Sequence, residues 1–217
     1  MRYSGEPGWI NEEAGAKRRP NFNGCNPCGE ILLDSHGLCN LTTVNVMGFV
    51  KDGALDRTAL LHAQRLSARA GYRMTCRELE MHSWNAVQQR DRLLGCSVTG
   101  WQDMVNATRM TRDDQVALLR ELRETAHSAA AEIADQLGGK RPLLVTTVKP
   151  EGTLSLLPTV SSGVHYSHAP YYIRRVRISA ADPLCKVGED LGYPVLPEVG
   201  QDPDDPTTKV VEFPVQA

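Results

Sequence analysis

Residues 26–40 read NPCGEILLDSHGLCN and carry two cysteines, Cys28 and Cys39, eleven positions apart. Asn26, Cys28 and Glu30 occupy alternate positions in the first part of this stretch. Because alternate residues of an extended segment point to the same side, we expect the amide, the thiol and the carboxylate to face one small substrate. The second thiol, at Cys39, follows closely. The stretch therefore predicts a site that combines thiol chemistry with acid–base chemistry.

The composition is that of an ordinary soluble globular protein. The chain has 217 residues, 41% hydrophobic and 23% charged, enough to bury a core. A formal net charge of -2 argues against binding to nucleic acid or a membrane surface through bulk charge. No apolar run approaches the roughly 20 residues of a membrane span, and the first seven residues lack the apolar core of a signal peptide. We therefore expect a cytoplasmic protein.

The six cysteines should be largely reduced in that compartment. They are better interpreted as reactive thiols, metal ligands or buried side chains than as a disulfide scaffold.

Helices and strands are expected to alternate along the chain. Residues 1–25 are polar and aperiodic and predict an irregular arm. Asp56, Ser83 and Thr111 are suitable N-caps. Apolar spacing predicts helices at 57–70, 84–94, 112–137 and 183–191, with a short helix after Gly100. Strands are expected at 41–50, 143–148, 172–179 and 209–215. This order favours an α/β fold with a largely parallel sheet.

The run Asn-Pro-Cys-Gly-Glu at 26–30, followed by Leu-Cys-Asn-Leu at 38–41, resembles the radical-cysteine loop of ribonucleotide reductases. The short gap between the cysteines is most similar to the adenosylcobalamin-dependent (class II) branch, in its monomeric triphosphate-reducing form. The resemblance implies that the chain is part of a ten-stranded α/β barrel, with Cys28 on a central finger loop. Residues 92–100 resemble a family segment that joins two helices, with Cys96 as a buried thiol.

The resemblance also implies a role for each residue of the loop. Replacing a ribose 2'-OH by hydrogen is difficult unless a radical at the 3'-carbon assists the departure of the hydroxyl. In the family, Cys28 would carry the thiyl radical, Glu30 would be the general base for the 3'-OH, and Asn26 would hydrogen-bond the sugar hydroxyls. Cys39 would be one half of the reducing dithiol. The implied substrate is a ribonucleotide, the cofactor adenosylcobalamin, and the reductant thioredoxin or a similar dithiol.

A second motif lies at 149–163, where an expected strand runs into a loop rich in Gly, Ser and Thr. Backbone N–H groups at a following helix start can bind an anion, although the Walker spacing is absent. The loop and the segments 161–165, 172–177 and 211–214 are similar to the substrate-phosphate region of class II reductases. By that resemblance the phosphate ligands are Gly152, Thr153, Leu154 and Ser155. Glu151 departs from the family, in which a small hydroxyl residue is common, and its carboxylate must point away from a bound phosphate.

Two alternatives remain open from the sequence. Cys25, Cys28, His36 and Cys39 could bind zinc in a non-enzymatic module. The same reductase chemistry could also belong to the di-iron or the glycyl-radical class, although Glu30 and the close cysteines favour the cobalamin branch. The arginines of 174–177 are interpreted as a solvated or ion-paired strand face rather than as a phosphate clamp.

The resemblance implies that residues 1–217 form a partial catalytic barrel domain, with an arm (1–25), a radical-cysteine loop (26–40) and a phosphate loop (149–163). In the family the redox partner of Cys39 lies well upstream, and a further C-terminal dithiol lies downstream. We therefore expect the N- and C-terminal parts of the enzyme to be missing from this sequence.

Overall fold

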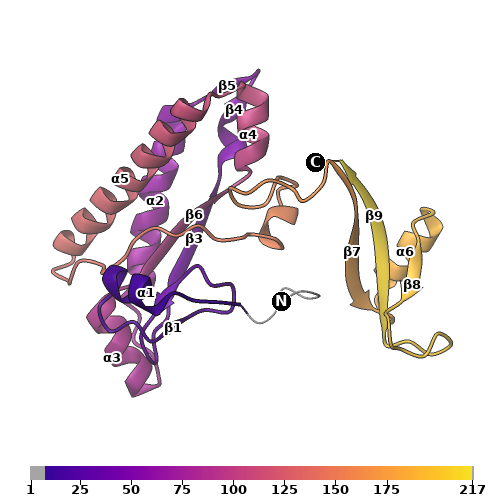
Figure 1. Ribbon diagram of the computed structural model, residues 1–217, viewed down its shortest axis with the longest axis horizontal. Coiled ribbons are helices and arrows are strands. Elements are labelled where there is room, and N and C mark those ends of the chain that lie inside the picture. The colour runs from indigo at the N-terminus through magenta and orange to yellow at the C-terminus, as the bar shows by residue number, and fades with distance from the viewer. Residues whose placement is uncertain (1–7, 217) are drawn as a thin grey trace. The chain divides into compact units, whose positions relative to one another are not determined.

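The computed structural model describes residues 8–216, which belong to two compact units, residues 1–166 and 167–217. None of the helices within residues 8–216 is both long and apolar enough to cross a membrane. Figure 1 shows the order of the helices and strands in each unit.

The first unit is built on two parallel strands, β3 (Asn40–Asn45) and β6 (Leu94–Thr99). One face of this pair is covered by the long helices α2 (Arg57–Thr75) and α5 (Arg112–Gln136), which run side by side (Figure 1). Asp56 and Thr111 cap the two helices by accepting backbone N–H groups through their side-chain oxygens, as expected. Apolar residues of both helices and both strands form the core: Leu60, Ala68, Tyr72, Leu94, Val98, Leu122, Ala126 and Ile133.

Residues 143–147 lie beside β6 and extend the pair. The backbone N–H of Leu94 donates to the Leu144 carbonyl at 3.0 Å, and that of Thr147 donates to the Cys96 carbonyl at 3.1 Å. Only one parallel bridge forms, between Cys96 and Thr146. The strand expected at 143–148 is therefore an extended segment with a single bridge.

Shorter elements complete the first unit. A two-stranded antiparallel hairpin, β1 (Gly24–Cys25) with β2 (Leu32–Leu33), contains the first sequence motif, and β4 (Val50–Lys51) pairs with β5 (Ala54–Leu55). The remaining helices are α1 (Glu12–Arg18), η1 (Val46–Phe49), α3 (His82–Asp91), α4 (Trp101–Thr108) and η2 (Leu154–Leu156).

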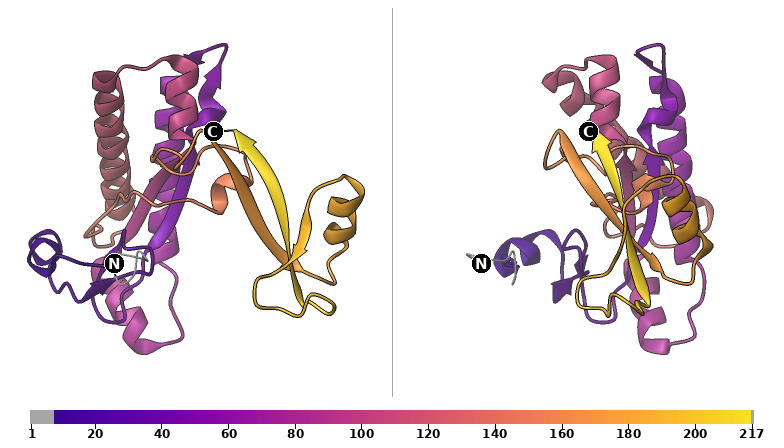
Figure 2. Two further views of the ribbon diagram at one scale, coloured as in Figure 1. Left: turned by 45° about the vertical axis from the view of Figure 1, so that its right-hand side comes forward. Right: turned by 90° about the vertical axis from the view of Figure 1, so that its right-hand side faces the viewer.

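The second unit is a three-stranded antiparallel sheet with one helix. Its strands are β7 (Tyr171–Ser179), β8 (Val195–Pro197) and β9 (Thr208–Gln216), in the order β7-β9-β8. Helix α6 (Pro183–Asp190), capped by Asp182, packs against the sheet (Figure 2). Arg175 and Arg177 form exposed ion pairs with Glu212 and Glu198, which confirms the ion-paired interpretation of this strand.

Three expectations about the fold were wrong. Residues 1–25 are not irregular throughout, because Asn11 caps α1 by accepting the Ala14 N–H at 2.9 Å. The helix expected at 84–94 ends at Asp91, where Arg92 adopts a left-handed conformation without glycine, and residues 94–99 form the fully buried strand β6, which joins α3 to α4. The sheet is largely parallel only in the first unit, since the second is antiparallel. Cys96 is buried as expected, with 2% of its surface exposed.

Candidate active site

Cys28 lies at the tip of the β1–β2 hairpin, in a tight turn. The Gly29 N–H donates to the Asn26 carbonyl at 2.9 Å, and Gly29 has a φ of 80°, which glycine adopts without strain. The Asn26 side-chain oxygen accepts the Ile31 N–H at 3.0 Å. The expected extended run at 26–30 is therefore wrong, and the Asn26 side chain braces the hairpin. The Cys28 side chain is exposed.

Glu30 begins the return leg of the hairpin and contacts the framework of the first unit. Its backbone carbonyl accepts a hydrogen bond from Thr147 Oγ1 at 2.9 Å. Both oxygens of its carboxylate are buried, and neither has a hydrogen-bond partner among the described residues. A buried acceptor without a donor is costly, so this carboxylate is suited to a hydroxyl supplied by a ligand.

Cys39 lies at the start of β3 and faces Gly95 of β6. A Cβ placed on Gly95 would lie 2.8 Å from Cys39 Sγ and 3.2 Å from the Thr147 methyl group. Burial, together with the nearby Cys96 thiol and Glu30 carboxylate, raises the pKa of the Cys39 thiol to about 12. Cys39, Glu30 and Thr147 therefore meet on one face of the β3–β6 pair.

Cys96 lies on the other face. It is adjacent to Gly95 in β6, and successive side chains of a strand point to opposite faces. Its thiol packs in the apolar cluster with Ala68, Tyr72 and Ile133. Cys96 is therefore not placed to form a disulfide with Cys39.

The raised pKa of Cys39 predicts slow alkylation. At pH 8 the thiolate fraction falls about 10³-fold when the thiol pKa rises from 9.0 to about 12. We expect iodoacetamide to label Cys39 far more slowly than the exposed Cys28 and Cys76, as read by peptide mass spectrometry. Equal labelling rates at the three cysteines of the folded chain would contradict this environment for Cys39.

The same pKa shift predicts how stability depends on pH. A thiol whose pKa is raised on folding stabilises the folded state fully below pH 9 and loses that contribution as the pH rises toward 12. Cys39→Ser should therefore unfold with a weaker pH dependence between pH 9 and 11 than the unchanged chain.

Gly95 is required by close packing at this face. In Gly95→Ala the new methyl carbon would lie 2.5 Å from a methyl carbon of Leu41 as well as against Cys39. We expect a loss of about 1–3 kcal/mol in the free energy of unfolding, measured by urea denaturation. Gly71→Ala on α2 is the matched control, because its added methyl would meet ordinary contacts at 3.6 Å or more. Equal losses in the two variants would show that the Cys39 face is not closely packed.

The loop at 149–163 crosses the same polar face of β3 and β6. The Lys149 N–H donates to Ser97 Oγ at 3.2 Å, and Thr43 Oγ1 donates to Glu151 Oε1 at 2.6 Å. Thr99 Oγ1 donates to the Ser161 carbonyl at 3.1 Å. The two sequence motifs are thus brought to one face, with the orange segment of Figure 1 lying across the strands.

Glu151 points away from the exposed side of its loop. It is 1% exposed, and Thr43 binds one of its oxygens. The departure from the family at this position therefore places no carboxylate among the expected phosphate ligands.

The four expected phosphate ligands fall into two groups. Gly152, Thr153 and Leu154 are exposed at the start of η2, and their N–H groups donate to no acceptor among residues 8–216. Ser155 is fully buried, and its hydroxyl lies 2.9 Å from Ser162 Oγ. In this conformation the N–H groups of the first three residues are accessible to an anion, and the Ser155 side chain stabilises the turn.

A cavity of about 950 Å³ adjoins this site. Its lining includes Gly29, Glu30 and Thr147, continues along residues 144–148 and reaches Leu119 and Leu122 of α5, but does not include Cys28, Cys39 or any residue of the loop at 149–163. A space of this size accommodates a ligand as large as a nucleotide.

No role was predicted for the hydroxyl residues that hold the site together. Thr43, Thr147, Ser97 and Thr99 bind the two motifs in place. The sequence pattern that could have identified them is hydroxyl residues at alternate positions of otherwise apolar strands. Such a pattern marks one polar face of a sheet.

The arrangement gives no support to the zinc alternative. Within residues 8–216, no three His, Cys, Asp or Glu side chains come together as a metal site. His36 instead packs edge-on against Trp84 and hydrogen-bonds Ser35.

Comparisons with known proteins agree with the resemblance. Residues 3–142 match the family model "Ribonucleotide reductase, barrel domain". The adenosylcobalamin-dependent ribonucleoside-triphosphate reductase of Lacticaseibacillus paracasei is 30% identical over 99% of this chain and 32% of its own length. The enzyme of the same name from Euglena gracilis is 31% identical over 100% of this chain and 30% of its own length.

Solved structures show the same fold. A B-12 dependent (class II) ribonucleotide reductase superposes with a TM-score of 0.73 at 25% identity, over 91% of this chain and 30% of that chain. The class Id α subunit of Actinobacillus ureae shares the fold, with a TM-score of 0.58 at 19% identity over 88% of this chain and 41% of that chain.

The chain spans about a third of the length of the curated relatives it matches. The parallel strands, their covering helices and the cysteine hairpin correspond to part of the reductase α/β barrel. The family model covers well over half of the chain, so the chain belongs to the ribonucleotide reductase barrel-domain family.

Proposed function

We propose that this chain carries the reaction centre of an adenosylcobalamin-dependent ribonucleoside-triphosphate reductase. The reaction converts a ribonucleotide and a dithiol into a 2'-deoxyribonucleotide, water and a disulfide, and it supplies DNA precursors. The names of the relatives support the substrate and the cofactor.

The observation that carries the proposal is the carboxylate of Glu30. Its oxygens are buried and have no donor among residues 8–216, and it lines the cavity of about 950 Å³ and lies near Cys39. A ribose 3'-OH supplies the missing donor, and Glu30 then accepts its proton as general base. Cys28, two residues away and exposed, removes the 3'-hydrogen as a thiyl radical.

Cys39 supplies hydrogen to the 2'-carbon after the C2'–O bond breaks and the oxygen leaves as water. The thiol is protonated at neutral pH, and its raised pKa extends that state to alkaline pH. The second thiol of the disulfide comes from a residue other than Cys96, which faces the opposite side. The free amide N–H₂ of Asn26 donates to a sugar hydroxyl while its oxygen braces the hairpin.

The triphosphate is bound by the loop at 149–163. The N–H groups of Gly152, Thr153 and Leu154 and the Thr153 hydroxyl contact it, and Ser155 holds the turn from behind.

Adenosylcobalamin fits one feature of this chain, the exposed thiol of Cys28 at the hairpin tip. When bound, the cofactor supplies the radical that removes the hydrogen from this thiol. Thioredoxin or a similar dithiol protein reduces the disulfide formed at Cys39, and the cytoplasm is where both operate.

The test is a product assay on the protein expressed from its native locus. A labelled ribonucleoside triphosphate, adenosylcobalamin and a dithiol are supplied, and the products are separated by chromatography. The proposal expects a 2'-deoxyribonucleoside triphosphate that requires both additions. Reduction that proceeds without the cobalamin would move the chain to another reductase class, and no reduction by folded protein would refute the activity.

A further inference from the structure

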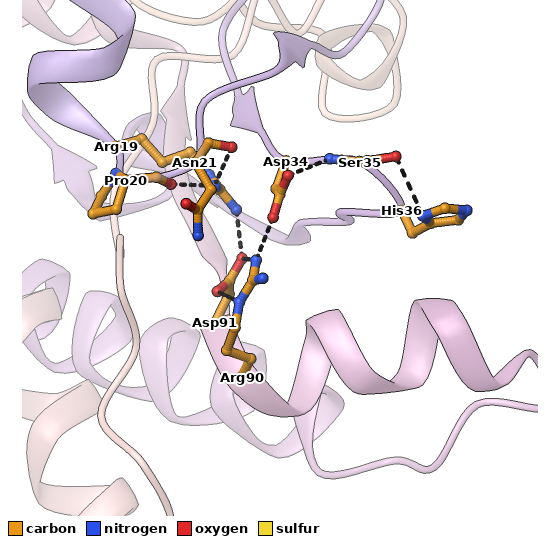
Figure 3. Close-up of polar contacts among 8 residues, drawn as sticks. All are labelled: Arg19, Pro20, Asn21, Asp34, Ser35, His36, Arg90 and Asp91. Atoms are coloured by element: carbon orange, nitrogen blue, oxygen red, sulfur yellow. Dashed lines mark hydrogen bonds and ion pairs between the residues drawn. The ribbon is translucent and has the colours of Figure 1, made fainter.

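Asp91, the last residue of α3, is held by two arginines. Arg19 donates from Nη2 to Asp91 Oδ2, and Arg90 donates from Nε to Oδ1 at 2.7 Å and from Nη2 to Oδ2 at 2.9 Å. Arg19 is fully buried and the Asp91 side chain is 8% exposed. The carboxylate is therefore saturated with charged donors (Figure 3).

The two arginines reach opposite legs of the β1–β2 hairpin. Arg19 donates from Nη1 to the Pro20 carbonyl at 2.8 Å and to the Asn21 carbonyl at 3.3 Å, just before β1. Arg90 donates from Nη2 to Asp34 Oδ2 at 2.7 Å, just after β2. Asp91 and its neighbour Arg90 thus anchor the two ends of the segment that carries Cys28 (Figure 3).

Asp91 is itself fixed to the strands of the active site. It lies three residues before β6, the strand on which Cys39 packs. Its backbone carbonyl accepts the Leu143 N–H at 2.9 Å, where the segment leading to Thr147 begins. Thr147 in turn binds the Glu30 carbonyl. The hairpin is therefore held at its two legs and near its tip by one rigid framework.

Two other ion pairs of the first unit do not hold the hairpin. The exposed pair Arg65–Glu132 links α2 to α5, and the exposed pair Arg141–Asp135 links α5 to the segment that follows it; neither includes a hairpin residue. The buried pair also carries a cost, because Arg19 Nε has no partner in the described part of the chain. A merely stabilising role does not explain why both legs are bound by the adjacent residues Arg90 and Asp91.

We propose that Asp91, Arg19, Arg90 and Asp34 form a positioning clamp that sets the place of Cys28 and Glu30 relative to Cys39. The catalytic role of the clamp rests on the proposed function. Its mechanical role, to hold the hairpin in place, rests on the contacts alone. A shift of about 1 Å in a reacting group can lower a rate about 10²-fold, so a loosened clamp slows the chemistry without removing a catalytic group.

Asp34→Asn tests the clamp. It removes the charge at the second leg and leaves the buried Arg19–Asp91 pair intact, so the protein keeps its fold. We expect the amides of Asn23, Asn26 and Ile31, which are bonded within the hairpin, to exchange hydrogen about tenfold faster. The amides of β3 and β6 should keep their rates. In the reductase assay, kcat should fall about tenfold with an unchanged KM, and Asp34→Glu should restore most of it.

Asp135→Asn is the matched control, because it breaks an exposed aspartate–arginine pair that does not touch the hairpin. Unchanged hairpin exchange in Asp34→Asn would overturn the clamp, as would an equal fall of kcat in the control. If the unchanged protein reduced no ribonucleotide, the proposed function would fail, and the exchange rates alone would still decide the clamp.

Discussion

Cys28→Ala will abolish both deoxyribonucleotide formation and the exchange of the substrate 3'-hydrogen. In the proposed reaction the Cys28 sulfur carries the radical, and alanine offers no bond from which hydrogen can be removed and returned. The substitution should leave stability nearly unchanged, because the Cys28 side chain is exposed at a turn. The measurements are product formation and release of tritium from a 3'-tritiated ribonucleotide.

Two further variants separate the roles of the cysteines. Cys39→Ser should stop deoxyribonucleotide formation, the first turnover included, but leave tritium release from the 3'-position, because in the proposed reaction it removes the reductant and not the radical. Cys76→Ala, another exposed thiol, should retain full activity. Equal loss of tritium release in the Cys28 and Cys39 variants would contradict separate roles for the two residues.

Glu30→Gln should lower kcat by about 10²–10⁴-fold, the usual contribution of a general base. The amide fills the same space but cannot accept the 3'-OH proton. Stability should not fall and should rise slightly, since the substitution removes a buried charge that no protein donor satisfies. Steady-state kinetics and urea denaturation measure the two effects.

Glu132→Gln on α5 is the control for this variant. That carboxylate is exposed and paired with Arg65, outside the site, so kcat should not change. A Glu30→Gln protein that kept its rate, or that lost rate and stability together, would argue against a general base at this position.

Much of the fold followed from local signals. The caps at Asp56 and Thr111, with apolar spacing behind them, predicted α2 and α5 within a few residues. The sequence signals were weaker where a residue adopts an unusual backbone conformation. Arg92 ends α3 with a φ of 47°, a conformation normally adopted by glycine, so the end of the helix and the following strand β6 were missed. Asn11 capped α1 within a segment too polar to show a helical pattern.

Candidate site residues could be named from the sequence, but their geometry could not. Asn26, Cys28, Glu30 and Cys39 came from a resemblance in sequence, which carries no distances. The turn at Gly29 and the Thr147–Glu30 contact, across 117 positions, depend on tertiary packing that no local pattern encodes. The arginine–aspartate clamp was likewise invisible, because each of its charged residues reads as a solvated surface side chain.

The most direct test of the account is an electron paramagnetic resonance measurement of the radical itself. Protein mixed with ribonucleotide, adenosylcobalamin and a dithiol is frozen within milliseconds, with and without β-deuterated cysteine. The account predicts a sulfur-centred signal that narrows with the deuterated cysteine, disappears in Cys28→Ser and persists in Cys39→Ser. A cysteine radical that survives Cys28→Ser would contradict the assignment of Cys28, and with it the role given to this hairpin.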